Sequence, residues 1–410
     1  MQNVGYNYRI IGRWVEKNTK TMTKIQLTLL SLFYFTFTIG QVNDCNCINE
    51  LNDISEKIKN AKSYKVQIKG DKIIEFEKWK TEIETEIKKD SLIDFFCVGY
   101  LQKYISFIND LHNQVYATQK NEFIQAPNYT KSIDTTQIQN DSVSGIYYAG
   151  NNKILIKKEN NNTWLGITLE SNSSKWEKGK IRLVIKKTKY NIFEIFEYLQ
   201  NGILIYQKDV KIENGRIHST FWNKQNKLFF NQNHVDNFTY KTINSSFDYI
   251  GIKTLKRTKI LMEEADKFIE QNLRNITKPN LIIDLRNNGG GSTKQAEKLL
   301  ESLKNNENIE HIYIIINFKT ASAAELITLK LKEDKRTIIV GENSKGMIEY
   351  GHGNKSYSST SNCSAFKIDL STEQTDKNLS IHECIGIKPD YSLNNASDWI
   401  EQIININPKE

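Results

Sequence analysis

The spacing of apolar residues changes twice along this chain of 410 residues. Between residues 48 and 116, apolar side chains recur every three or four positions, which places them on one face of a helix. The first four are Ile48, Leu51, Ile54 and Ile58. The more fully apolar stretch from Leu92 to Leu111 predicts the most buried helix. We therefore expect an N-terminal helical subdomain over residues 41–118 and a polar linker over 119–142.

From residue 143 to about residue 255 the period of the pattern falls to two. Short runs of β-branched and aromatic residues alternate with clusters of Asn, Gly and Ser, and these runs are GIYYAG, KILIKK, TWLGITLE, IRLVIKK and NGILIYQ. Such alternation is typical of strands, and Gly150-Asn151-Asn152 favours a hairpin turn. We expect a small β domain over 143–245, built as an antiparallel sheet or a small barrel.

After residue 245, helix patterns alternate with strand patterns. The expected elements are a helix at about 257–273, a strand at Leu281–Leu285, a helix at about 293–304, a strand at Ile312–Asn317, a helix from Ser322, a strand at Thr337–Val340 and a short helix around 395–405. Strands that alternate with helices of this length predict βαβ units and a parallel sheet. The fold class is therefore α+β, with an α/β core over residues 246–410.

The N-terminal segment, residues 1–40, has the pattern of a leader. Lys24 precedes an apolar run from Leu27 to Ile39, and the small residue Gly40 follows. These features describe a signal peptide, whereas a membrane-spanning helix needs about 20 apolar residues. We expect translation to start at Met22 and the mature protein to be periplasmic or secreted, without stable membrane insertion. An uncleaved membrane anchor is the alternative.

Composition narrows the classes of partner. A hydrophobic content of 39% with only 4 Pro is that of a folded protein rather than a disordered one. The net charge is +8, but residues 1–40 contain five basic residues against one acidic residue, so half of this charge belongs to the leader. No basic stripe with interleaved aromatic residues remains, and we expect no nucleic-acid partner. No His pair has zinc spacing, so we assign no metal and no cofactor.

Five cysteines follow the leader, namely Cys45, Cys47, Cys97, Cys363 and Cys384. Because their number is odd, at least one thiol stays unpaired or pairs between chains. Cys363 and Cys384 flank a predicted strand–loop–strand stretch. We expect these two to form a disulfide, which suits an exported protein.

The most informative motif is DLRNNGGGS, from Asp284 to Ser292, directly after a predicted buried strand. Three glycines at the carboxyl end of a parallel strand allow a sharp turn and expose backbone N–H groups. The spacing fits neither a phosphate-binding loop nor a dinucleotide-binding loop. An oxyanion hole and a plain tight turn remain as interpretations.

A second motif, TASAAE from Thr320 to Glu325, follows the next strand and opens a helix. Ser322 would lie at the positive end of the helix dipole, beside N–H groups without intrahelical partners. An oxyanion formed there would be stabilised. The plainer interpretation is that Ser322 is only the N-cap, a position that Ser often occupies.

Together, these motifs resemble the tail-specific, or C-terminal processing, serine peptidases, which include the tricorn core. The matching segments, in family order, are Tyr249–Ile252, Asp284–Gly291, Thr320–Glu325, Gly341-Glu342 with Gly346, and Gly386–Asp390. The resemblance covers about residues 245–395 and implies a core of the ClpP/crotonase type. By resemblance, Ser322 is the nucleophile, and Gly291 and Ala323 supply the oxyanion-hole N–H groups.

One position departs from the processing peptidases, which activate the serine with a lysine in a Gly-Lys-Gly turn. Here that turn contains Met347, and the nearest lysine is Lys345, two residues earlier. The tricorn branch is similar to this chain in another way, because it uses a histidine and a glutamate. The resemblance implies His112 as general base and Glu383 as supporting acid.

Several alternatives remain open. The tricorn branch has a serine directly before its histidine, where this chain has Leu111, so the link from Glu383 to the site is open, with water as one candidate. The plain interpretations are a helix-end histidine for His112 and a solvated acid for Glu383. We expect Glu325 to pack or cap near the nucleophile helix and Arg286 to anchor the glycine loop.

The sequence thus predicts an exported serine endopeptidase that acts on polypeptide substrates through an acyl-enzyme. Lys345 is the alternative base. The alternative function is that of a catalytically inactive relative that binds peptides or another ligand, which the missing lysine motivates. No carboxylate-binding loop of a PDZ domain is found between residues 120 and 245, and the sequence does not indicate an oligomeric state.

Overall fold

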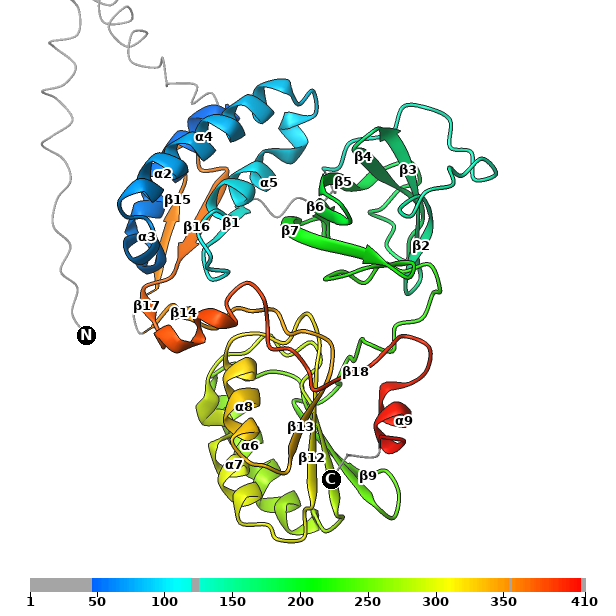
Figure 1. The fold of residues 1–410 in the computed structure, drawn as a ribbon, viewed down its shortest axis with the longest axis vertical. Coiled ribbons are helices and arrows are strands. Elements are labelled where there is room, and N and C mark those ends of the chain that lie inside the picture. The colour runs from blue at the N-terminus through cyan, green and yellow to red at the C-terminus, as the bar shows by residue number, and fades with distance from the viewer. Residues whose placement is uncertain (1–45, 119–124, 354–355, 407–410) are drawn as a thin grey trace, which may run out of the picture. The chain divides into compact units, whose positions relative to one another are not determined.

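The computed structural model describes residues 46–118, 125–353 and 356–406 (Figure 1). The leader predicted over residues 1–40 lies outside these residues. The described residues belong to one compact unit that begins at Asn46. Within them, no helix combines the length and the apolar character needed to cross a membrane. Helices and strands share the chain, which confirms the α+β class.

The N-terminal region is helical up to residue 105. Its helices are α2 (Cys47–Lys57), the 3-10 turn η1 (Ile58–Asn60), α3 (Lys62–Gln67), α4 (Asp71–Lys89) and α5 (Ile93–Ile105). Helix α5 is buried on several sides and packs against α2, α4 and β7 (Leu204–Glu213), as its apolar sequence predicts. The helical prediction is wrong at its end, because Gln114–Ala117 form strand β1. This strand pairs antiparallel with β16 (Phe366–Leu370), a partner that no local pattern can reveal.

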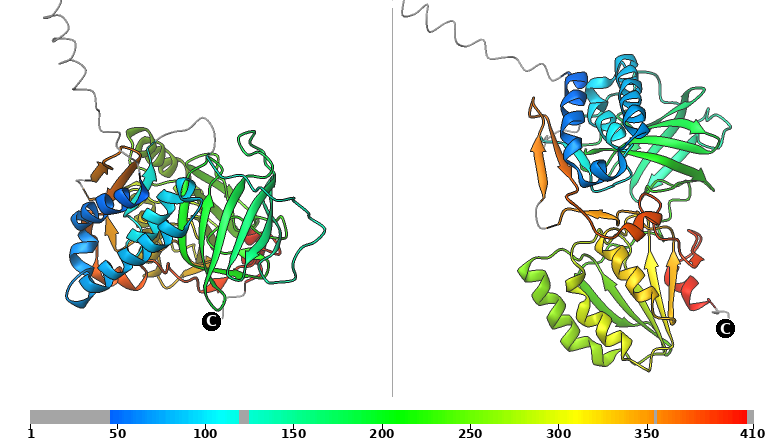
Figure 2. Two further views of the ribbon diagram at one scale, coloured as in Figure 1. Left: turned by 90° about the horizontal axis from the view of Figure 1, so that it is seen from above. Right: turned by 60° about the vertical axis from the view of Figure 1, so that its left-hand side comes forward.

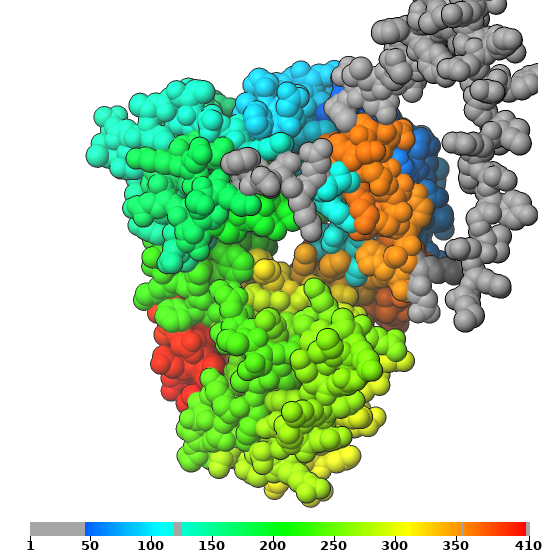
Figure 3. All heavy atoms as spheres, turned by 180° about the vertical axis from the view of Figure 1, so that it is seen from behind, coloured from blue at the N-terminus to red at the C-terminus, as the bar shows by residue number. Residues whose placement is uncertain are grey.

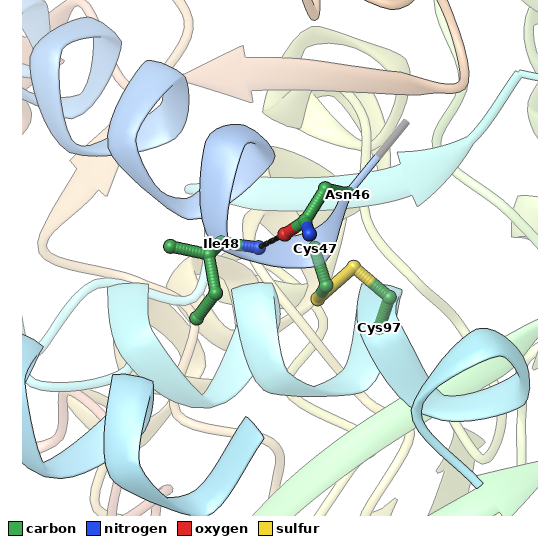
Figure 4. The surroundings of a disulfide bond; sticks show 4 residues. All are labelled: Asn46, Cys47, Ile48 and Cys97. Atoms are coloured by element: carbon green, nitrogen blue, oxygen red, sulfur yellow. Dashed lines mark hydrogen bonds between the residues drawn. A yellow bond between two sulfur atoms is a disulfide. The ribbon is translucent and has the colours of Figure 1, made fainter. Parts of the chain in front are cut away.

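A disulfide joins Cys47 on α2 to Cys97 on α5, with the two Cα atoms 5.6 Å apart (Figure 4). The side chain of Asn46 caps α2 by accepting the N–H of Ile48 at 2.8 Å. The predicted Cys363–Cys384 disulfide is wrong. Cys384 is a free thiol, whereas Cys363 is disulfide-bonded to another cysteine. Cys384 is held in a turn instead, where its N–H donates to Gly346 O.

The β-rich segment forms a seven-stranded antiparallel sheet in which each strand pairs with the next. Its strands are β2 (Gly145–Ala149), β3 (Asn152–Asn160), β4 (Thr163–Glu170), β5 (Ile181–Lys189), β6 (Ile192–Tyr198), β7 and β8 (Arg216–Ile217), drawn side by side in green in Figure 2. The predicted hairpin turn at Gly150 joins β2 to β3 and is confirmed. Isolated bridges from Asn223 to Tyr148 and Arg216 link the first and last strands.

The C-terminal core is a six-stranded sheet in the order β18-β13-β12-β11-β10-β9. Its strands are β9 (Phe238–Thr242), β10 (Phe247–Ile252), β11 (Asn280–Asp284), β12 (His311–Ile316), β13 (Thr337–Gly341) and β18 (Tyr391–Ser392). Strands β10 to β13 and β18 are parallel, whereas β9 runs antiparallel to β10. The predicted parallel sheet is confirmed, with strand ends within about a residue of those expected.

Alternate residues of these strands face two different layers, as the strand period requires. On one side of the sheet, Leu281 and Ile283 pack with α6 (Lys259–Asn272), α7 (Glu297–Lys304) and α8 (Ala323–Lys332). Figure 3 shows this C-terminal core from behind, in green to yellow. Ile282 packs on the other side with α9 (Trp399–Ile404). Because the strands are parallel, the connections from strand to helix all leave from the same edge of the sheet. The glycine motif, Asp284–Ser292, and the serine motif, Thr320–Glu325, meet at this edge.

After β13 the chain leaves the core sheet and forms two small pairings. Strand β14 (Tyr350–Gly351) pairs with β17 (Glu373–Gln374), and β15 (Tyr357–Thr360) pairs with β16. Figure 2 shows β15 and β16 in orange beside the blue N-terminal helices, and Ile368 of β16 belongs to their apolar core. The segment between β13 and β18 therefore joins strand β1, near the N-terminal helices, to the C-terminal core. The domain boundaries drawn from the sequence stay predictions.

Replacing Cys97 with Ser should lower the free energy of unfolding by about 2–4 kcal/mol, because a disulfide across a sequence separation of 50 restricts the unfolded chain. Urea unfolding followed by tryptophan fluorescence measures the loss. Cys384→Ser, at the free thiol, is the matched control. An equal loss in both variants would show that thiol packing, rather than the cross-link, provides the stability.

Candidate active site

Ser322 lies in the turn between β12 and α8 and has φ 55° and ψ −123°. Residues with a side chain seldom adopt this left-handed conformation, and strain of this kind concentrates at functional sites. A strained turn between a strand and a helix is one way in which a protein exposes a nucleophilic serine. Ser322 is half-buried and is also the N-cap residue of α8, so both interpretations drawn from the sequence refer to the same turn.

The glycine loop (Asn287–Ser292) packs directly against this turn. A Cβ atom on Gly290 would lie 2.6 Å from Ala321 O and 2.8 Å from Ser322 Cβ, so only glycine permits the approach. The N–H of Ala321 donates to Asn288 O at 3.0 Å and fixes the contact. The two motifs that the sequence singled out therefore lie side by side.

Two backbone donors of these two motifs remain unused. Within the described residues, the N–H groups of Gly291 and Ala323 have no hydrogen-bond acceptor, whereas that of Gly290 donates to Asn288 Oδ1 at 3.0 Å. An unpaired N–H at Ala323 is expected for the first turn of a helix. Unpaired donors beside a serine are what an oxyanion hole requires.

Arg286 holds the strand end on which the glycine loop is built, as predicted. It forms a buried ion pair with Asp284, with Nη2 2.5 Å from Oδ2, and it donates to Phe229 O at 2.7 Å. Burial acts to raise the pKa of Asp284, but the Arg286 guanidinium outweighs it and holds that pKa below its ordinary value. Tyr249 adds a hydrogen bond to the same carboxylate at 3.0 Å.

Glu325 connects the serine turn to the loop formed by residues 344–349. Its fully buried carboxylate accepts four hydrogen bonds, from Ser322 N at 2.8 Å, Ser344 Oγ at 2.5 Å, Gly346 N at 2.8 Å and Met347 N at 3.0 Å. Burial raises the pKa of Glu325, and these donors act in the opposite direction. The predicted capping role of Glu325 is confirmed.

The two candidates for a lysine base have different surroundings. Met347, at the position of the lysine in the processing peptidases, contributes its N–H to Glu325. The N–H of Lys345 donates to Thr320 O at 2.9 Å, which places its backbone beside the turn that carries Ser322. Desolvation and the nearby Lys319 lower the pKa of the Lys345 ammonium, while Glu325 opposes this shift.

His112 is buried, with 4% of its surface exposed. The interpretation of His112 as a helix-end histidine is wrong, because α5 ends at Ile105. Its ring meets the ring of His352 edge-on, with centroids 5.5 Å apart. Burial lowers the pKa of His112 to about 3, and His352 and Lys345 add to this shift. The imidazole is therefore neutral at physiological pH.

Glu383 is buried and does not contact the His112 ring. Its Oε1 accepts the N–H of Leu111 at 3.1 Å, and its Oε2 accepts those of Ile348 at 2.9 Å and Glu349 at 2.7 Å. Burial raises the pKa of Glu383 to about 7 against these three donors, and Asp110 adds to the rise. The interpretation of Glu383 as a solvated acid is wrong. Its carboxylate holds the residue directly before His112.

The 344–349 loop thus links the predicted residues. Glu325 binds its first part and Glu383 binds its second part, so a continuous set of hydrogen bonds leads from the Ser322 turn to the segment that carries His112. Within the described residues, no hydrogen bond joins Ser322 Oγ to His112 or Lys345. In the same part of the chain, no group of three or more His, Cys, Asp or Glu side chains is arranged to hold a metal ion.

Residues 247–312 and 305–393 match the model of peptidase family S41. This C-terminal core is similar to the peptidases of family S41. The match confirms the resemblance drawn from the motifs. It includes Ser322, the glycine loop and Glu383, but His112 lies outside it. A comparison with curated protein sequences found no significant match.

Solved structures resemble the chain at low identity. A lipoprotein from Streptococcus agalactiae has 19% identity and a TM-score of 0.28, covering 39% of this chain and 66% of its own. The photosystem II D1 C-terminal processing protease has 13% identity and a TM-score of 0.34, covering 87% and 95%. Mature CPAF has 12% identity and a TM-score of 0.41, covering 85% and 93%. These TM-scores do not establish a common arrangement of the whole chain.

Sequence reasoning missed two residues around the S41 site. Asn317, directly after β12, holds the glycine loop by accepting the N–H of Asn287 at 3.0 Å. Asp110 accepts the main-chain N–H of His112 at 2.8 Å. The second residue had a local signal, because an Asp two positions before another residue often accepts that residue's N–H.

Glu325→Gln should lower the free energy of unfolding by about 3 kcal/mol, because the amide nitrogen would face backbone N–H donors that the carboxylate now accepts. Thermal and urea unfolding of the full chain measure the change. Glu333→Gln, at the exposed C-cap of α8, is the matched control and should have little effect. Equal stability of the two variants would contradict the connecting role of Glu325.

Proposed function

We propose that this protein is an exported serine endopeptidase that hydrolyses peptide bonds through an acyl-enzyme. The main support is the strained Ser322 turn, which lies against the glycine loop at the N-terminus of α8 within the S41 domain. In the proposed reaction, Ser322 Oγ attacks the carbonyl carbon of the scissile bond. The N–H groups of Gly291 and Ala323 then stabilise the oxyanion.

His112 acts as the general base in this proposal. Its Nε2 takes the proton from Ser322 Oγ and returns it to the leaving amine as the C–N bond breaks. In the second half, His112 takes a proton from water, which attacks the ester and releases the product carboxylate, and the proton returns to Ser322. The buried imidazole is neutral and therefore has a lone pair that can accept the proton, but burial also lowers its basicity, so the imidazolium must be stabilised once it forms.

Glu383 supports the base through the main chain. It binds Leu111 on one side and the 344–349 loop on the other, so it holds the base segment against the loop that Glu325 ties to Ser322. The reaction requires His112 Nε2 to reach Ser322 Oγ once substrate is bound. Catalytic hydrogen bonds are often long before the Michaelis complex forms.

Export is part of the proposal. Disulfides persist in oxidising compartments and are rare in the cytosol. The Cys47–Cys97 disulfide and the oxidised state of Cys363 fit a periplasmic or secreted protein, as does the signal peptide predicted before residue 41. The substrate class that follows from the S41 domain is polypeptide.

A fluorophosphonate probe should label the folded protein stoichiometrically at Ser322, because the probe captures a serine that has a working base and oxyanion hole. Mass spectrometry of the labelled peptide measures this, and Ser322→Ala should remain unlabelled. Folded wild-type protein that takes up no label would favour the alternative of a peptide- or ligand-binding protein without activity.

The same labelling experiment identifies the base. His112→Ala should slow labelling about 10²–10⁴-fold, the range that general base catalysis contributes. Lys345→Ala should retain the wild-type rate within about tenfold. The reverse order of the two variants would assign the role of base to Lys345, and circular dichroism of each variant excludes unfolding as the cause.

Peptidase activity should rise with pH around pH 7, because Glu383, with a pKa of about 7, accepts all three N–H groups only when ionised. His112, with a pKa of about 3, does not titrate there.

The free energy of unfolding should fall as the pH rises over the same range. Since folding raises the pKa of Glu383 from 4.5, its contribution is present below pH 4.5 and is lost as pH rises to about 7. Glu383→Gln should remove both trends, and trends that persist in this variant would assign them to another group.

A further inference from the structure

A buried carboxylate other than Glu383 lies beside the His112 ring. Asp110 is 4% exposed, and its Oδ1 lies 3.7 Å from His112 Nδ1. Within the described residues, neither Asp110 Oδ2 nor His112 Nδ1 has a hydrogen-bond partner. Burying polar atoms without partners costs free energy and is rare in folded proteins. Rotation of the two side chains would bring the Asp110 carboxylate and His112 Nδ1 into hydrogen-bond distance of each other.

The backbone around this pair is fixed on both sides. Asp110 Oδ1 accepts the N–H of His112 at 2.8 Å, and the N–H of Leu111 is bound by Glu383. Strand β1 begins at Gln114 and pairs with β16. Only side-chain torsions are left to shorten 3.7 Å to the 2.7–3.2 Å of a normal N–H···O bond, a change of about 0.5–1 Å.

We propose that Asp110 is the positioning residue that orients the His112 ring. Its carboxylate accepts the Nδ1–H, which leaves the lone pair of Nε2 free to take the Ser322 proton. When His112 becomes an imidazolium, Asp110 stays ionised and stabilises it, and the proton on Nε2 then passes to the leaving amine. This inference rests on the proposed function, in which His112 is the base.

Asp110 and Glu383 have different contacts and therefore different roles. Both oxygens of Glu383 are occupied by backbone donors. Among the described residues, Asp110 is the only carboxylate within 4.0 Å of a His112 ring nitrogen. The other groups near the ring are His352 and Lys345, whose charges oppose an imidazolium. Burial raises the pKa of Asp110, and a donated Nδ1–H would favour its ionised form.

Asp110→Asn in the full chain tests this role. Asn keeps the volume, but its single oxygen would have to accept both the main-chain N–H of His112 and the Nδ1–H, and it carries no negative charge to stabilise the imidazolium. We expect kcat to fall about 10²–10⁴-fold while KM changes less than about threefold. The matched control is Asp369→Asn on β16, where the carboxylate accepts the Tyr116 hydroxyl at 2.6 Å, and it should keep the wild-type kcat.

Nitrogen NMR of the His112 ring in Ser322→Ala protein gives a readout that needs neither activity nor the Asp110 variant. We expect the Nδ1–H tautomer, with a proton that is shifted downfield and exchanges slowly with water. An Nε2–H tautomer would overturn the inference even if Asp110→Asn fails to fold. So would a folded Asp110→Asn protein with the kcat of the wild type. If the fluorophosphonate probe does not react with the wild-type protein, the proposed peptidase activity is rejected. The tautomer of His112 still tests the Asp110–His112 contact in that case.

Discussion

The 344–349 loop is held between two buried carboxylates, and the geometry of the site depends on this constraint. Glu325 accepts donors from one part of the loop and Glu383 from the other. Removing a carboxylate from water is costly, which is why burial raises the pKa of both. Three or four hydrogen bonds to each carboxylate offset that cost. The same bonds join the Ser322 turn to Leu111, which is 272 residues from Glu383 in sequence.

The strained turn at Ser322 is stable because its neighbours determine its conformation. Glu325 accepts the Ser322 N–H, and Asn288 accepts that of Ala321. Gly290 lets the glycine loop approach to a distance that no other residue allows. Strain at a functional site persists only where the surroundings impose it in this way. These contacts fix the backbone on the nucleophile side of the site, so in the proposed reaction the side chain of His112 has to close the remaining distance to Ser322.

Local patterns predicted the parts of the structure that local forces determine. The strands and helices around the glycine loop and Ser322 follow from periodicity, and the fold class follows from their alternation. The β1–β16 pairing and the Cys47–Cys97 disulfide could not be predicted, since both join segments far apart in sequence. The predicted Cys363–Cys384 disulfide is wrong, because two cysteines that flank the same predicted strands need not lie within bonding distance in the folded chain. Asp110 was missed because its role depends on the burial of His112.

Residue 347, a lysine in the processing peptidases and Met here, is tied into the loop through its main-chain N–H, which donates to Glu325. A base can then come from a different segment without rebuilding the nucleophile turn. Lys345 is coupled to that base, since its charge lowers the pKa of His112. A lysine so placed favours the neutral imidazole before reaction and opposes the imidazolium during it. In the proposed mechanism, an ionised Asp110 beside Nδ1 supplies the negative charge that balances this effect.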